Sequence, residues 1–162
     1  MASPVASRRA TPDGSDNPER STVSTSDVAA ANKAVVEAFF NTADANLEDF
    51  MTRLTKTVDP DFVVHQAAGL PWGGDHKGPD GFVHVQELIR GELLDLGVAD
   101  LEIWADGDVV ISKFRLLGTS KTTGKKYDVP QVEIWRFRDG KPVSLTPFYY
   151  DTHEVRNLVG QA

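Results

Sequence analysis

The sequence contains no cysteine, and this absence excludes disulfides, thiol nucleophiles and thiolate metal sites. It also lacks a run of basic residues: 17 Lys and Arg stand against 24 Asp and Glu, a net charge of −7. The sequence therefore provides no electrostatic attraction to nucleic acid or to anionic membranes. No stretch reaches the ~18 consecutive apolar residues of a membrane-spanning helix. We expect a cytoplasmic protein that binds neither nucleic acid nor membrane.

Residues 1–27 contain no Leu, Ile, Phe, Tyr or Trp and are rich in Ser, Pro and Thr. Such a segment buries too little apolar surface to offset the entropy lost on ordering. The pair Arg8-Arg9 is not followed by the apolar run of ~7–15 residues that an export signal needs. We predict a disordered tail over residues 1–27 and a single domain over residues 28–162.

Apolar residues recur at helical spacing in three segments of the first half. The first lies behind a cap at Ser26 or Asp27, the second behind a cap at Asn46. The third begins at Pro79, a residue favoured in the first helical turn, and ends near Gly97. The first half is therefore predicted to be mostly helical.

The second half has the alternation and β-branched content of strands. The predicted strands lie near 100–105, 108–118, 126–138 and 142–150, and the segments "ADGD", "KTTGKK" and "RDGKP" between them are plausible reversals. The short run "DFVVH", ending at residue 65, is a further strand. Helices followed by an antiparallel meander predict an α+β domain with a cavity between the two layers.

The segment "GLPWGGDHKGPDG", residues 69–81, has five glycines but not the GK[ST] of a phosphate-binding loop. His65, Asp75 and His76 are candidate metal ligands, but their spacing matches no standard motif. We therefore expect no metal. The glycines favour a mobile flap, with Trp72 offering an apolar surface at the rim of the cavity.

Three stretches carry a resemblance to a known family: "LPWGGDHKGPDGFVHVQELI", "VPQVEIWRFRDGKPV" and "PFYYDTHEVRNLVG". Together with the order of elements, they resemble the SnoaL-like and ketosteroid-isomerase-like families of the nuclear-transport-factor-2 (NTF2-like) superfamily, over roughly residues 28 to 160. The resemblance implies an NTF2-like cone, in which three N-terminal helices pack on a strongly curved, mostly antiparallel sheet and enclose a pocket. It is less specific for chemistry, because this scaffold carries many reactions as well as binding modules.

The resemblance assigns candidate roles to single positions. His65 occupies the position of the general base, Glu133 that of the protonated acid of the oxyanion hole, and Tyr149 that of a pocket aromatic. The isomerases of this family also have an oxyanion-hole tyrosine in their first helix. That tyrosine has no counterpart in this sequence, since the aligned position is about Ala38. Its absence argues against a true steroid isomerase, whose use of a neutral carboxyl group is a known example of this chemistry.

The residues themselves leave alternatives open. The alternation of strand 126–138 places Glu133 between Gln131 and Trp135, where a carboxyl group must be protonated, hydrogen-bonded or ion-paired unless that face is solvated. His65 either faces the cavity or binds a loop carbonyl, and Asp151 is either catalytic or a helix cap. The catalytic candidates are His65, Glu133 and Asp151; the candidates for binding the substrate are Trp72, Tyr149, Trp135, Gln131, Phe39 and Phe40.

Two functions follow. The first is a cofactor-independent acid–base enzyme of the isomerase, cyclase or dehydratase type, acting on an apolar carbonyl compound such as a polyketide or steroid-like molecule. The second is a non-catalytic module for binding a small molecule or for dimerisation. The resemblance also implies a homodimer formed through the outer sheet face, where Ile111, Lys113, Arg115 and Leu117 or their alternates lie.

Overall fold

The computed structural model describes residues 24–41 and 47–161. Most of the expected tail and the expected cap at Asn46 lie outside these residues. The helices are α1 (Thr25–Asn41), α2 (Leu47–Thr57), α3 (Gly78–Glu92) and α4 (Thr152–Leu158). None of the described helices has the length and apolar character that crossing a membrane requires.

The strands form one six-stranded sheet in the order β2-β1-β6-β5-β4-β3. Their bounds are β1 (Val63–Gln66), β2 (Gly74–Lys77), β3 (Leu93–Asp106), β4 (Val109–Ser120), β5 (Lys126–Arg138) and β6 (Lys141–Tyr149). All neighbouring pairs are antiparallel except β1 with β6. The sheet is therefore mixed and mostly antiparallel, as the α+β prediction requires.

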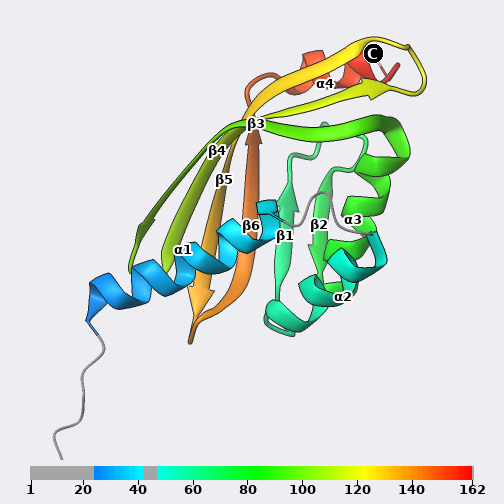
Figure 1. Ribbon diagram of the computed structural model, residues 1–162. Helices are drawn as coiled ribbons and strands as arrows, with labels where there is room; N and C mark the ends of the chain where they lie inside the picture. The colour runs from blue at the N-terminus through cyan, green and yellow to red at the C-terminus, as the bar shows by residue number, and fades with distance from the viewer. Residues whose placement is uncertain (1–23, 42–46, 162) are drawn as a thin grey trace, which may run out of the picture.

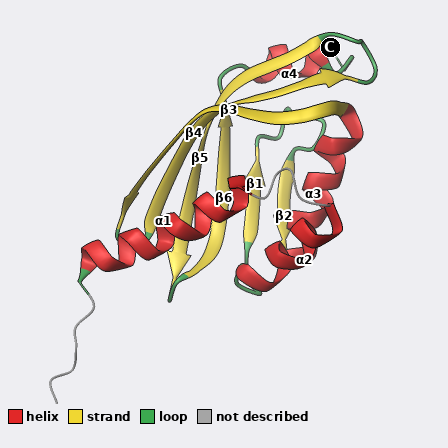
Figure 2. Ribbon diagram, viewed as in Figure 1, coloured by secondary structure: helices red, strands yellow, loops and turns green. Residues whose placement is uncertain are grey.

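The long strands β3 to β6 form a curved sheet that α1 crosses, whereas α2 and α3 lie beside β1 and β2 (Figure 1). The short α4 lies near the end of the β4–β5 hairpin, where the Thr123 hydroxyl donates to the Leu158 carbonyl. Figure 2 shows α1, α2 and α3 together on one side of the sheet and α4 apart from them, at the far end of the long strands. None of the described helices covers the other face of β3 to β6.

Helix α1 is held to the sheet by a buried polar contact. Asn32 is almost fully buried, and its side-chain amide donates to the carbonyl of Gly107 in the β3–β4 turn at 2.9 Å. At the start of the helix, the Ser24 hydroxyl accepts from the Asp27 backbone N–H, so the cap lies two residues before Ser26. Helix α1 therefore begins at Thr25, three residues before the expected boundary at residue 28.

Two boundaries differ from the sequence prediction. Helix α3 ends at Glu92 rather than near Gly97, because the chain turns directly into β3, where buried Leu93 pairs with Ser120. The expected flap over residues 69–81 contains β2 and the start of α3 instead. Gly73 is required by close packing, since a Cβ atom there would lie 2.5 Å from the Ala67 carbonyl oxygen. The glycines of this segment thus serve tight turns within an ordered structure.

Candidate functional site

A cavity of about 110 Å³ lies between α1, α2, α3 and the inner face of the sheet. Its lining is mostly apolar and aromatic, with a few polar side chains, as is usual for small-molecule sites. Six of the predicted site residues line it: Phe39, Phe40, Gln131, Glu133, Trp135 and Tyr149. The alternation of β5 therefore identified the inner face correctly.

The register of the sheet places the polar side chains of this cavity in rows. Glu133 of β5 lies directly between Ser112 of β4 and Pro147 of β6. In the neighbouring row, Gln131 lies beside Tyr149. Because residues opposite each other in a sheet point to the same side, the Glu133 carboxyl group and the Tyr149 hydroxyl enter one space.

Aromatic rings form the apolar part of this space. Phe39 of α1 stacks on Trp135, with ring centroids 5.3 Å apart and an interplanar angle of 12°. Phe40 meets Phe114 of β4 edge-on at 4.9 Å. These contacts close the cavity on the α1 side and surround Glu133 with apolar surface.

Burial raises the pKa of Glu133 to about 7, against the opposing effect of hydrogen bonds from Ser112 and Trp135. The Ser112 hydroxyl donates to Glu133 Oε2 at 3.2 Å, and the Trp135 indole N–H donates to Ser112 Oγ at 3.3 Å. The Ser112 contact thus holds the carboxyl group in position, and a pKa of about 7 allows the group to gain or lose a proton near neutral pH.

This raised pKa predicts that the protein becomes less stable as the pH rises. The folded state keeps a proton on Glu133 that the unfolded state releases near 4.5, so the stabilisation is complete below that pH and is lost as the pH passes about 7. We expect the free energy of unfolding in urea to fall by about 2–3 kcal/mol more between about pH 5 and 8 in the wild type than in Glu133→Gln. Parallel pH profiles for the two proteins would contradict it.

The Tyr149 hydroxyl accepts a hydrogen bond from the Trp72 indole N–H at 3.1 Å. Burial raises the pKa of Tyr149, and the nearby Glu133 carboxylate raises it further, so the phenol stays protonated. Since its oxygen already accepts from Trp72, its own O–H is left to donate. The site therefore holds one acid–base group and one neutral donor.

Comparison with known families identifies this architecture. The profile described as "SnoaL-like domain" matches residues 33–145, more than half of the chain. The chain belongs to the SnoaL-like family. No curated protein matches it.

Solved structures similar to this SnoaL-like chain share its fold at low sequence identity. They include an NTF2-like protein of unknown function from Burkholderia pseudomallei K96243, at 18% identity and TM-score 0.70 over 80% of this chain and 97% of the other. A candidate SnoaL-like polyketide cyclase from Jannaschia sp. CCS1 has 19% identity and TM-score 0.71, over 83% and 95%. TerC, co-crystallised with polyporic acid, has 20% identity and TM-score 0.67, over 80% and 98%. These likenesses establish the NTF2-like fold.

In this SnoaL-like domain His65 does not face the cavity, contrary to the prediction. Val64 and Gln66 point into it, so the alternate residue His65 lies on the opposite side of β1. The His65 Nδ1 atom lies 2.8 Å from an oxygen of Asp75 on β2, and 44% of the side chain is exposed. The His65 imidazole therefore does not line the cavity in which the base was expected.

Trp72 and Asp151, predicted to bind the substrate and to take part in catalysis, do not line the cavity either. Trp72 is only 1% exposed and does not line the cavity; it packs behind Tyr149 as part of the core. Asp151 caps α4, accepting from the backbone N–H groups of His153 and Glu154. The cap interpretation of Asp151 was therefore the better one.

Three polar residues of the cavity were not predicted: Gln66, Gln86 and Arg90. The Oε1 atoms of Gln66 and Gln131 and the Nε atom of Arg90 are buried without a hydrogen-bond partner. Alternation along β1 places Val64 and Gln66 on one face and Val63 and His65 on the other. Gln66 could have been found by assigning the first of these faces to the cavity. The part of the chain that the structure describes contains no group of three or more His, Asp or Glu able to hold a metal ion.

Proposed function

We propose that this SnoaL-like domain is a cofactor-independent acid–base enzyme that acts on an apolar small molecule bearing a carbonyl group. The reaction belongs to the isomerase, cyclase or dehydratase type. One observation carries the proposal: a carboxyl group with a pKa of about 7, that of Glu133, lies in an aromatic cavity beside the protonated Tyr149 hydroxyl. A base whose pKa lies near the working pH is the most effective proton carrier.

The common step is removal of a proton from the carbon next to the carbonyl. The Glu133 carboxylate takes this proton, so a C–H bond breaks, an O–H bond forms and the electron pair moves to the carbonyl oxygen. The Tyr149 O–H donates to that oxygen and stabilises the enolate. Return of the proton to another atom would complete an isomerisation, and attack by the enolate carbon would complete a cyclisation.

The comparisons support this chemistry by analogy. One structural neighbour is a candidate polyketide cyclase, and another was crystallised with polyporic acid. Because both are below 25% identical to this chain, the activity named for one and the ligand of the other indicate only what the fold can accommodate.

Deuterium exchange tests the proposal without knowledge of the natural substrate. We would incubate the protein in D₂O with 2-tetralone, a bicyclic ketone, at about pH 8, where Glu133 is mostly ionised. Exchange at the α-carbon, followed by proton NMR, should be faster with protein than in buffer. Exchange at the buffer rate, while 2-tetralone is bound in the cavity, would contradict catalysis.

That outcome would instead support the second candidate, a non-catalytic binding module. The orientation of His65 favours this alternative, because the imidazole does not line the cavity. Glu133 is then the one His, Asp or Glu among the described residues that line it. Both candidates predict that 2-tetralone binds in the cavity, but only the enzyme is expected to accelerate its deuterium exchange.

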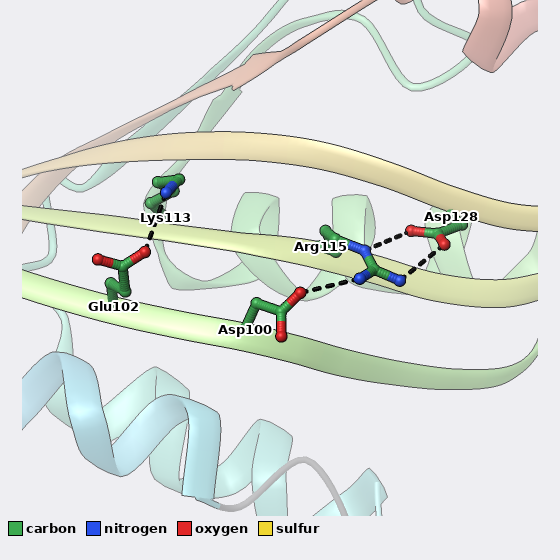
Figure 3. A network of polar contacts seen from close by, with 5 residues as sticks. All are labelled: Asp100, Glu102, Lys113, Arg115 and Asp128. Carbon is green, nitrogen blue, oxygen red and sulfur yellow. Dashed lines mark hydrogen bonds and ion pairs between the residues drawn. The ribbon is translucent and has the colours of Figure 1, made fainter.

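We also propose a homodimer through the uncovered face of the sheet. On this face Trp104 and Phe148 are 49% and 54% exposed. Lys113 pairs with Glu102, and Arg115 pairs with Asp100 and Asp128, across neighbouring strands (Figure 3). Exposed apolar side chains between such polar pairs are typical of an interface.

Light scattering tests the dimer. The wild type should show twice the 17.7 kDa mass of one chain, and Phe148→Lys should show the single mass. A wild-type monomer at the concentrations used for the exchange assay would contradict it.

A further inference from the structure

The cavity contains a cationic side chain, Arg90, that has no anionic partner among the residues that the structure describes. Arg90 lies on α3, four residues after Gln86, and both side chains line the cavity. The Arg90 Nε atom is buried and makes no hydrogen bond. Among residues 24–41 and 47–161, no carboxylate lies within ion-pair distance of its guanidinium group. The guanidinium carbon lies 5.7 Å from the centre of the Phe50 ring, a distance at which a cation and an aromatic face attract each other.

This lack of a partner is not due to a shortage of carboxylates, since acidic residues outnumber basic ones by 24 to 17. The exposed Arg115 has two carboxylate partners, and the exposed Arg138 pairs with Asp59 and Asp61. The partly buried Arg90 has none within the described part of the chain, although burial of an unpaired charge is unfavourable. Desolvation lowers the pKa of Arg90, yet a guanidinium group remains charged at neutral pH.

Arg90 and Glu133 act at separate places in the cavity. Arg90 lies on α3 and Glu133 on β5, and no ion pair joins the two side chains. In keeping with this, burial, Ser112 and Trp135 shift the pKa of Glu133, and Arg90 does not. A ligand that spans the cavity therefore meets a cation at one place and a carboxyl group at another. Phe50, Ile89 and Leu116 supply apolar lining.

We infer that the ligand of this cavity is an anion, an apolar ring compound whose carboxylate or other acidic group pairs with Arg90 while its carbonyl group lies at Glu133. This inference rests on the proposed function and narrows its substrate class. A planar guanidinium group suits a carboxylate, because two parallel N–H donors can meet its two oxygens. The positive charge of Arg90 would also attract an acidic molecule to this one place on a chain whose net charge is −7.

The test compares two fluorescent dyes with nearly the same rings. 8-Anilinonaphthalene-1-sulfonate is anionic and N-phenyl-1-naphthylamine is neutral, and both fluoresce on entering apolar sites. Binding is measured at about pH 6, where Glu133 is mostly protonated. Only the fluorescence displaced by 2-tetralone counts as binding in the cavity. The variants are Arg90→Met, Arg90→Lys and, as a control with the same change of charge, Arg53→Met on the exposed surface of α2.

We expect Arg90→Met to weaken the anionic dye by about tenfold or more, with less than a twofold change for the neutral dye. Arg90→Lys should retain part of the preference and Arg53→Met all of it. An equal loss for both dyes in Arg90→Met, or a wild type with no preference for the anion, would overturn the inference and leave the proposed cavity standing. If 2-tetralone displaced neither dye from the wild type, the proposed function would fail as well.

Discussion

Replacing Glu133 with glutamine is expected to slow the protein-dependent deuterium exchange of 2-tetralone by about 10²-fold or more. Glutamine has nearly the same size and still accepts from the Ser112 hydroxyl, but it cannot take up a proton at neutral pH. General acid–base help is worth ~10²–10⁴-fold, so its loss removes most of the acceleration. The rate is measured by proton NMR under saturating ketone.

Two control variants make this result specific. His65→Gln removes the imidazole that the sequence suggested as the base, and Glu87→Gln removes an exposed carboxylate on α3. Neither side chain lines the cavity, so both variants should exchange deuterium at the wild-type rate. A loss in His65→Gln equal to that in Glu133→Gln would show that the imidazole takes part, despite its place outside the cavity.

Trp72→Ala is expected to lower the free energy of unfolding by about 3–5 kcal/mol, the usual loss for a large aromatic side chain removed from a core. The residue is 1% exposed, and its indole N–H is the donor to Tyr149. Its removal leaves a void behind the cavity and takes away the hydrogen bond that orients the phenol. Urea unfolding, followed by circular dichroism, measures the loss.

Trp72→Phe and Tyr150→Ala separate the causes. The phenylalanine keeps most of the ring but not the N–H, so it should lose less stability while still disturbing Tyr149. Tyr150 is 84% exposed, and its truncation should change the free energy by less than about 1 kcal/mol. A loss in Trp72→Ala no larger than in Tyr150→Ala would mean that Trp72 is a surface residue of a flap, as the sequence first suggested.

The contrast between β5 and β1 shows where sequence patterns suffice. Along β5, buried residues such as Val129 and Trp135 alternate with exposed ones such as Asp128 and Arg136, so a single register fits. In β1 only four residues are available, and Val63 and Val64 are both apolar. The pattern could not choose the inner face, and the resemblance to a family with a base at this position favoured the wrong one.

The prediction of a flap over residues 69–81, which contain Trp72, was wrong for a different reason. Glycine and proline normally indicate loops, but here they serve close packing, as the short distance at Gly73 shows. Arg90 gave no signal, because an arginine beside the apolar stripe of a helix is ordinarily solvated. Only the tertiary structure reveals that its guanidinium group lacks a carboxylate, since that depends on residues distant in the sequence.

The proposed chemistry requires that Glu133 gains and loses a proton near neutral pH inside the cavity. The most direct measurement is a ¹³C NMR titration of the side-chain carboxyl groups in protein labelled with ¹³C at glutamate Cδ, with the Glu133 signal assigned by its absence in Glu133→Gln. We expect this signal to titrate with a midpoint of about 7 and to shift when 2-tetralone is added. A midpoint near the ordinary glutamate value of ~4.3 would contradict the account.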